Sequence, residues 1–160
     1  MITRRSILAF SICFASRATL ATPKSDSEIL LKASLPFAEK MLREHGGFLP
    51  YAYSMQADRT IAMVGGYDGQ ERPAPADILA LIKGVLKSFA ATHKIIASAV
   101  VSDALFTDPK TGVRSDAISV ALDHKDSFSV IVVYRYRVEK DGLHLEPPIA
   151  QKGNADIFVQ

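Results

Sequence analysis

The sequence predicts an α+β fold, in which an antiparallel sheet of about five strands packs with two main helices in the order α-β-β-α-β-β-β. Two segments, near residues 25–45 and 78–89, carry apolar residues at helical spacing. The other segments alternate or are rich in β-branched residues, and short turns join them, so consecutive strands are expected to be antiparallel neighbours. The helices either form a single layer on the sheet or lie one on each face.

The first 21 residues are expected to be an export signal that is cleaved. Arg4 and Arg5 form a positive start, residues 7–15 are apolar, and Ala18 or Ala21 offers a cleavage point. The apolar stretch is shorter than the roughly 20 residues that a membrane span needs. The protein is therefore expected in the periplasm or secreted, without a transmembrane span in the mature chain. The alternative is an uncleaved N-terminal helix of an intracellular structural protein.

Composition limits the function of the exported chain. Removing the signal removes three arginines and leaves 16 basic against 17 acidic residues, a net charge of −1. That balance argues against nucleic-acid binding. Cleavage also removes Cys13, the single cysteine, which excludes a disulfide, a cysteine nucleophile and a thiolate metal site in the mature chain. No cofactor is predicted.

The first helix has a capping-box pattern at Ser25 and Glu28. Pro36 lies inside it and is expected to kink the helix or to start a second one. The helix is expected to end at Gly46, because glycine favours the left-handed conformation just past a helix. His45 then lies in the last turn, where it suits the free carbonyl groups, and a catalytic role for it is not favoured.

Two strands are predicted at residues 48–55 and 60–64, followed by a loop at residues 65–75 that is rich in glycine and proline. In the second helix Gly84 is unfavourable, so close packing is expected there. The apolar face of this helix consists of Ile78, Leu81, Ile82, Val85, Leu86 and Phe89.

Three further strands are predicted at residues 94–106, 115–124 and 128–138. Pro147 and Pro148 are expected to stop further pairing. The chain then divides into a single domain over residues 25–146 and a C-terminal tail over residues 147–160. The tail either packs through Ile157 and Phe158 or hangs free.

Three stretches together resemble a widespread group of small bacterial proteins without assigned activity. They are PFAEKMLREHGGFLPYA at residues 36–52, GGYDG at residues 65–69 and SDAISVALDHKDSFSV at residues 115–130. The resemblance covers about residues 30–140; it implies one domain and carries no catalytic assignment. The order of elements is loosely similar to that of roadblock and longin domains.

Local signatures of catalysis are missing. The four histidines lack the local spacing of a zinc site, and no metal site is predicted. His124 beside Asp123 is a weak acid/base candidate, and a solvated hairpin turn is the alternative. Tyr67 and Asp68 in the loop at residues 65–75 are weak candidates for lining a pocket with these two.

Arg135 and Arg137 are the candidate binding residues. In the stretch YRYR, strand alternation places both arginines on one face and both tyrosines on the other. Guanidinium groups pair well with carboxylates, so this face is expected to receive an acidic partner. The alternative is a solvated outer face with the tyrosines toward the core.

The sequence thus favours a small protein-interaction domain, such as an adaptor, partner or inhibitor in the bacterial periplasm, rather than an enzyme. The expected surface is the arginine face or an unpaired sheet edge. The alternative is a small-ligand-binding protein or an enzyme with a pocket near the loop at residues 65–75.

Overall fold

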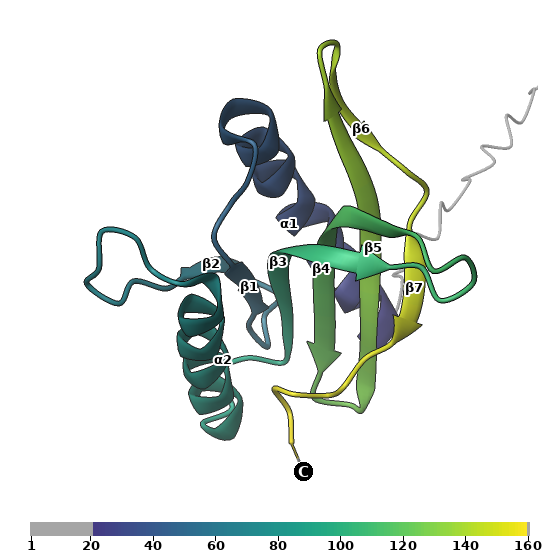
Figure 1. The fold of residues 1–160 in the computed structure, drawn as a ribbon. Coiled ribbons are helices and arrows are strands. Elements are labelled where there is room, and N and C mark those ends of the chain that lie inside the picture. Colours follow the sequence, from purple (N-terminus) through teal and green to yellow (C-terminus); the bar gives the residue numbers. More distant parts are fainter. Residues whose placement is uncertain (1–20, 160) are drawn as a thin grey trace, which may run out of the picture.

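A seven-stranded antiparallel sheet forms the centre of the computed structural model, which describes residues 21–159 (Figure 1). The α+β prediction is confirmed, with two strands more than the order expected. The predicted export signal, apart from Ala21, lies outside the described residues. In chain order the elements are α1 (Pro23–His45), β1 (Tyr51–Met55), β2 (Ile61–Gly65), α2 (Pro75–Ala91), β3 (Ala97–Thr107), β4 (Arg114–His124), β5 (Phe128–Glu139), β6 (Gly142–Leu145) and β7 (Ile149–Lys152).

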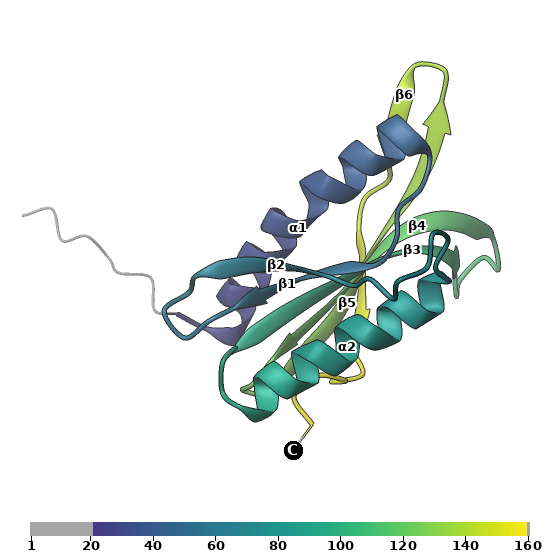
Figure 2. The same cartoon turned by 90° about the vertical axis from the view of Figure 1, so that its left-hand side faces the viewer.

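One helix lies on each face of the sheet, which is the second of the two predicted arrangements (Figure 2). Strand alternation explains the two cores, because successive residues point to opposite faces. In β4, Val120 and Leu122 belong to the core beneath α1, whereas Ala121 packs against the core beneath α2. The strand order is β2-β1-β3-β4-β5-β6, and β7 also pairs with β5.

Helix α1 begins one turn earlier than expected and runs without a break through Pro36. Its N-cap is Thr22, which forms a capping box with Ser25, so the assignment of Ser25 as the cap was wrong. Pro36 cannot donate to the carbonyl four residues before it, and both residues are exposed. Gly46 ends the helix with φ 72°, as predicted, and its N–H donates to the carbonyl of Leu42.

Helix α2 buries Ile78, Ile82 and Leu86, as its spacing predicts, but Leu81 remains 42% exposed. Close packing at Gly84 was a wrong expectation, since a Cβ placed there would meet nothing within 4 Å. Neither helix in residues 21–159 is both long and apolar enough to cross a bilayer.

The chain continues to pair after Pro147 and Pro148, so the expectation that they end pairing was wrong. β6 pairs with the last residues of β5, and β7 pairs with Val130–Val133 in its first half. The two prolines only interrupt this edge strand, which is a position where proline is tolerated. Ile157 is buried in the core beneath α2, and Phe158 packs against it.

Candidate functional site

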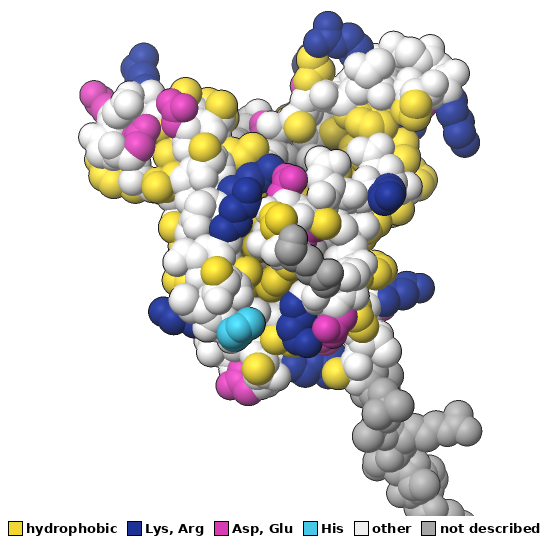
Figure 3. Space-filling view, turned by 90° about the horizontal axis from the view of Figure 1, so that it is seen from below, with side chains coloured by type: hydrophobic (Ala, Val, Ile, Leu, Met, Phe, Trp, Pro, Cys, Tyr) yellow, Lys and Arg dark blue, Asp and Glu magenta, His cyan; other side chains and the backbone are white. Residues whose placement is uncertain are grey.

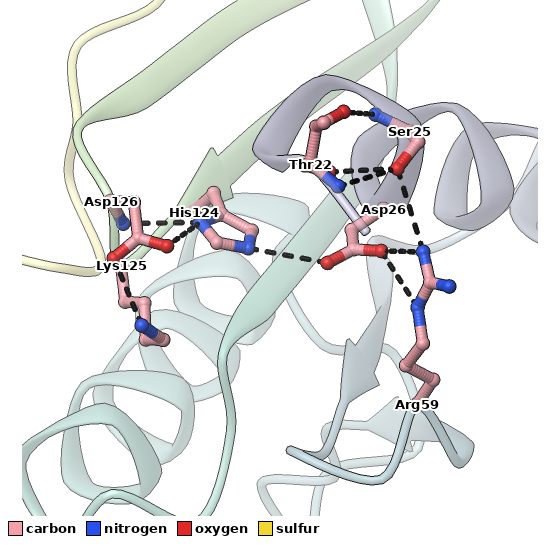
Figure 4. Close-up of polar contacts among 7 residues, drawn as sticks. All are labelled: Thr22, Ser25, Asp26, Arg59, His124, Lys125 and Asp126. Carbon is pink, nitrogen blue, oxygen red and sulfur yellow. Dashed lines mark hydrogen bonds and ion pairs between the residues drawn. The ribbon is translucent and has the colours of Figure 1, made fainter. Parts of the chain in front are cut away.

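His124 lies at the end of β4 and is buried, so the solvated turn expected for it was wrong. Its Nδ1 accepts a hydrogen bond of 3.0 Å from the backbone N–H of Asp126. The proton of the neutral ring therefore lies on Nε2, which is 3.5 Å from Oδ2 of Asp26 (Figure 4). Nε2 makes no hydrogen bond within residues 21–159, and His124 and Asp123 both line a hollow of about 290 Å³.

Asp26 is the buried centre of a cluster that joins three segments. It lies in the first turn of α1, and its Oδ1 accepts a hydrogen bond of 2.9 Å from Nε of Arg59 in the β1–β2 turn. Nη2 of Arg59 contacts the same oxygen and lies 3.5 Å from the hydroxyl oxygen of Ser25 (Figure 4). We call Asp26, Arg59 and His124 the Asp26 cluster. Sequence spacing does not reveal this cluster, because the three residues lie far apart in the chain.

Asp123 points away from His124, as successive strand residues do. Its Oδ1 accepts a hydrogen bond of 2.5 Å from the hydroxyl of Ser129, and its Oδ2 accepts one of 3.1 Å from the N–H of Ile157. The hydroxyl oxygen of Ser129 in turn accepts the N–H of Ala155. Asp123 thus anchors the C-terminal segment on the α2 side of the sheet.

The two loop candidates lie apart from His124. Tyr67 is 75% exposed, and Asp68 accepts the N–H of Gln70 to form a local turn. Their loop follows the last residue of β2, which pairs with Tyr51 at the start of β1. His124 pairs with Ala97 of β3, and Ala97 pairs with the last residue of β1. The loop and His124 therefore lie at opposite ends of β1. Tyr67, Asp68, Asp123 and His124 therefore do not form one site.

The two candidate arginines have different environments. Arg135 is half-buried, and its guanidinium lies 3.2 Å from Oδ2 of Asp108 and 2.6 Å from Oε2 of Glu146. Arg137 is exposed and lies 3.5 Å from a carboxylate oxygen of Glu139. Arg135 therefore binds acidic groups of its own chain, joining the β3–β4 turn to the link between β6 and β7.

One set of possible metal ligands lies on the β5–β6 hairpin. Ligand atoms of Glu139, Asp141 and His144 lie within 4.8 Å of one another, and all three residues are exposed. Nε2 of His144 is 2.8 Å from Oδ1 of Asp141, and this hydrogen bond raises the pKa of His144 and lowers that of Asp141. We interpret it as a surface ion pair, and we assign no metal to it.

The outer edge of β2 is unpaired in the part of the chain that the structure describes. The N–H of Gln56 donates to the carbonyl of Thr60, so even-numbered residues of β2 direct their backbone groups toward β1. The N–H and C=O groups of Ile61, Met63 and Gly65 therefore point outward. The segment Ile61–Gly65 contains no charged residue and no proline, and Met63 is 46% exposed. Edges of this kind readily accept another strand.

The opposite edge of the sheet is protected by contrast. It consists of two four-residue strands, β6 and β7, separated by Pro147 and Pro148. Lys152 ends the second of them. Short strands, prolines and lysine are features that hinder the addition of a further strand. The two edges therefore differ in their ability to bind an extended segment.

A hollow of about 370 Å³ lies beside β2 on the side that α2 covers. Ala62, Val64, Phe89 and Ile95 give it an apolar lining, and Lys94 is its one charged lining residue. We call this hollow, together with the outer edge of β2, the β2–α2 groove.

One further apolar side chain, Leu81, is exposed on α2. Lys83 forms an ion pair of 2.6 Å with Asp156, so its flank of α2 faces the C-terminal segment. Leu81 is two residues earlier, roughly 200° around the helix, and therefore lies on another flank.

Two other hollows flank the C-terminal segment, of about 400 and 290 Å³, and both are lined by Phe158 and Val159. On the underside of the molecule, hydrophobic side chains lie among lysines and arginines (Figure 3). None of these three hollows is lined by residues 66–74.

Comparisons with protein-family models, curated proteins and solved structures give no match to this chain. Function therefore has to be inferred from the residues and their geometry.

Proposed function

We propose that this protein is a small protein-interaction domain that binds an extended segment of a partner protein as an additional strand next to β2. The observation that carries the proposal is the outer edge of β2, where Ile61, Met63 and Gly65 direct unpaired backbone groups outward without a charge or a proline to block them. Strand addition at an exposed edge beside a helix is a common mode of peptide recognition.

The geometry gives separate roles to the two parts of the groove. A strand added to β2 lies about 4.8 Å from it and satisfies the outward backbone groups whatever its sequence. Its alternate side chains point toward the α2 side, where Ala62, Val64 and Phe89 offer an apolar surface. Backbone hydrogen bonds therefore support affinity, and the hollow supports selectivity.

The acidic groups of the protein argue against the arginine face as the main binding surface. Asp108 and Glu146 already neutralise Arg135, so an acidic partner would have to displace both. Arg137 is more accessible but lies beside Glu139. The β2 edge has no such internal competitor.

We further propose that the domain acts in the periplasm after export. The charged start, the short apolar stretch and the small residues near Ala21 support this. Cleavage after Ala21 would leave Thr22 as the first residue and would keep the Thr22–Ser25 capping box on the mature chain. Mass spectrometry of the native protein tests this: a chain that starts at Met1 would contradict export with cleavage.

A display selection with random 12-residue peptides tests the binding mode. In Met63→Pro the lost N–H points outward, so pairing with β1 should survive while a partner strand loses a donor and meets the proline ring. We expect selected peptides to bind this variant at least about tenfold more weakly, the equivalent of about one to two hydrogen bonds.

Ala150→Pro is the matched control. The N–H of Gly153 donates to Ser129, so alternation places the N–H of Ala150 outward on the opposite edge. This variant should bind the peptides as the wild type does. Equal binding to Met63→Pro, or no selected peptide at all, would count against strand addition.

A second candidate function is binding of a small anion with an apolar body in the hollow of about 400 Å³ beside the C-terminal segment. Ile95 and Ile157 line it, and Lys87, His93 and Lys125 supply basic groups, with no acidic residue in the lining. Calorimetric titration with dodecanoate tests this candidate. Binding that weakens in Lys87→Gln would support it, and no heat of binding would remove it.

A further inference from the structure

Lys94 is the feature of the β2–α2 groove that points to a class of partner. It follows α2, and its backbone N–H donates to the carbonyl of Phe89 at 2.9 Å. Its Nζ lies 5.5 Å from the centroid of the Phe89 ring. No carboxylate lies within ion-pair distance of it among residues 21–159. The ammonium group therefore lies over the ring of Phe89 and has no acidic partner among the described residues.

Three other basic groups of the fold have acidic partners, whereas Lys87 of α2, like Lys94, has none among residues 21–159. Lys83 pairs with Asp156, Arg59 with Asp26 and Lys125 with Asp126. When a partner strand covers the groove, water around Lys94 is displaced, and burying the ammonium without a carboxylate costs free energy. A carboxylate on the partner offsets that cost through a charge-assisted hydrogen bond.

From this we infer that the partner segment carries an acidic side chain next to an apolar one on the same face of the strand, with the carboxylate bound by Lys94. This inference depends on the proposed strand addition to β2. The apolar side chain contacts the lining formed by Ala62, Val64 and Phe89. Because side chains on one face of a strand repeat every second residue, the acid and the apolar residue are two positions apart.

Charge complementarity also distinguishes this partner from a second copy of the same chain. A dimer through β2 would place Ile61–Gly65 of the second copy in the groove, and this segment contains no carboxylate. The paired segment itself would therefore supply no counter-ion to Lys94. An extended segment of a different protein, with an acid in the position described, fits the groove better.

The display selection tests this inference when it is repeated with Lys94→Glu. We expect peptides selected on the wild-type protein to be enriched in Asp or Glu two positions from an apolar residue. Peptides selected on Lys94→Glu should instead be enriched in Lys or Arg at that position. Replacing the acid of one selected peptide by lysine should weaken binding to the wild type about tenfold or more and strengthen binding to the variant.

Lys40→Glu is the matched control, because Lys40 is an exposed lysine of α1 that does not line this groove. It should retain the preference of the wild type. Lys94→Gln is a second variant, which removes the charge without reversing it, and the preference for acidic peptides should disappear in it. Urea unfolding of each variant shows that it is folded.

The outcomes separate the two proposals. Peptides that lose affinity for Met63→Pro but show no acidic preference would overturn the inference about Lys94 and leave strand addition intact. A selection without any peptide sensitive to Met63→Pro would overturn both. Self-association that Met63→Pro abolishes, detected by sedimentation, would overturn the assignment of a different protein as the partner.

Discussion

Nε2 of His124 lies 3.5 Å from Oδ2 of Asp26, and the two side chains are only 3% and 4% exposed. The same carboxylate binds Arg59, which belongs to the turn that leads into β2. The Asp26 cluster therefore connects the start of α1 to the end of β4 and to the hairpin that carries the unpaired edge. The position of this edge depends on a polar contact that also stabilises the fold.

Asp26→Asn should destabilise the protein by about 1–3 kcal/mol, because it removes the counter-charge of the partly exposed Arg59 and changes the partner of His124. Urea unfolding measures this. Glu28→Gln is the control: this exposed residue lies in the same turn and should change stability by less than about 0.5 kcal/mol. Equal stability of the two variants would show that the cluster contributes little.

The pH dependence of stability should include a contribution from Asp103. Burial raises the pKa of this carboxyl, the hydrogen bond from the Tyr136 hydroxyl (2.8 Å) lowers it, and the charge of Asp116 raises it, so that the pKa is raised overall. A raised pKa in the folded state means that ionisation of Asp103 opposes folding. Its penalty is present at neutral pH and disappears as pH falls through the folded pKa toward the ordinary value of 3.8.

Asp103→Asn isolates this contribution, since the amide oxygen still accepts a hydrogen bond from Tyr136. We expect wild-type stability to increase relative to the variant as the pH is lowered from about 7 to about 4. Urea unfolding at several pH values measures the difference. A constant difference, or one that changes in the opposite direction, would contradict the role given to burial.

Gly153→Ala should release the C-terminal segment. A Cβ there would lie 2.8 Å from the backbone carbonyl carbon of Ser129, a contact that requires the chain to move. We expect a loss of about 1–3 kcal/mol and faster hydrogen exchange at the amides of Ala155 and Ile157. Gly84→Ala should instead stabilise the protein by about 1 kcal/mol, because the site is open and helical. Unchanged exchange in Gly153→Ala would show that the segment is not held as described.

Arg135→Met should cost about 1–2 kcal/mol, because it leaves Asp108 and Glu146 close together without a cation between them. The equivalent change at Arg137 should be nearly neutral, since that side chain is exposed. Urea unfolding of the two variants compares the same substitution in two environments. Equal effects would contradict the structural role of Arg135.

The regular parts of this fold could be predicted from sequence because their signals are local. The spacing of Ile78, Ile82 and Leu86 indicates one buried helix face, and the alternation around Val120 indicates a strand with a different core on each side. Gly46 marks the end of α1 by its conformation alone. These signals depend on neighbouring residues, and the tertiary structure preserves them.

The candidate site could not be predicted in the same way. Nothing near His124 in the sequence shows that Asp26 will lie beside it or that Arg59 will share the carboxylate. Alternation correctly separates Arg135 from the tyrosines, but it cannot show that Asp108 and Glu146 bind this arginine. An unpaired edge is likewise a property of the completed sheet, because the sequence pattern of a strand does not show whether the strand is central or at an edge.

Hydrogen exchange of the individual backbone amides of β2, with and without a selected peptide, tests strand addition most directly. We expect the outward amides of Ile61, Met63 and Gly65 to become protected when the peptide binds, while those of Ala62 and Val64, already paired with β1, change little. Peptide binding that leaves the three outward amides as exposed as before would contradict it.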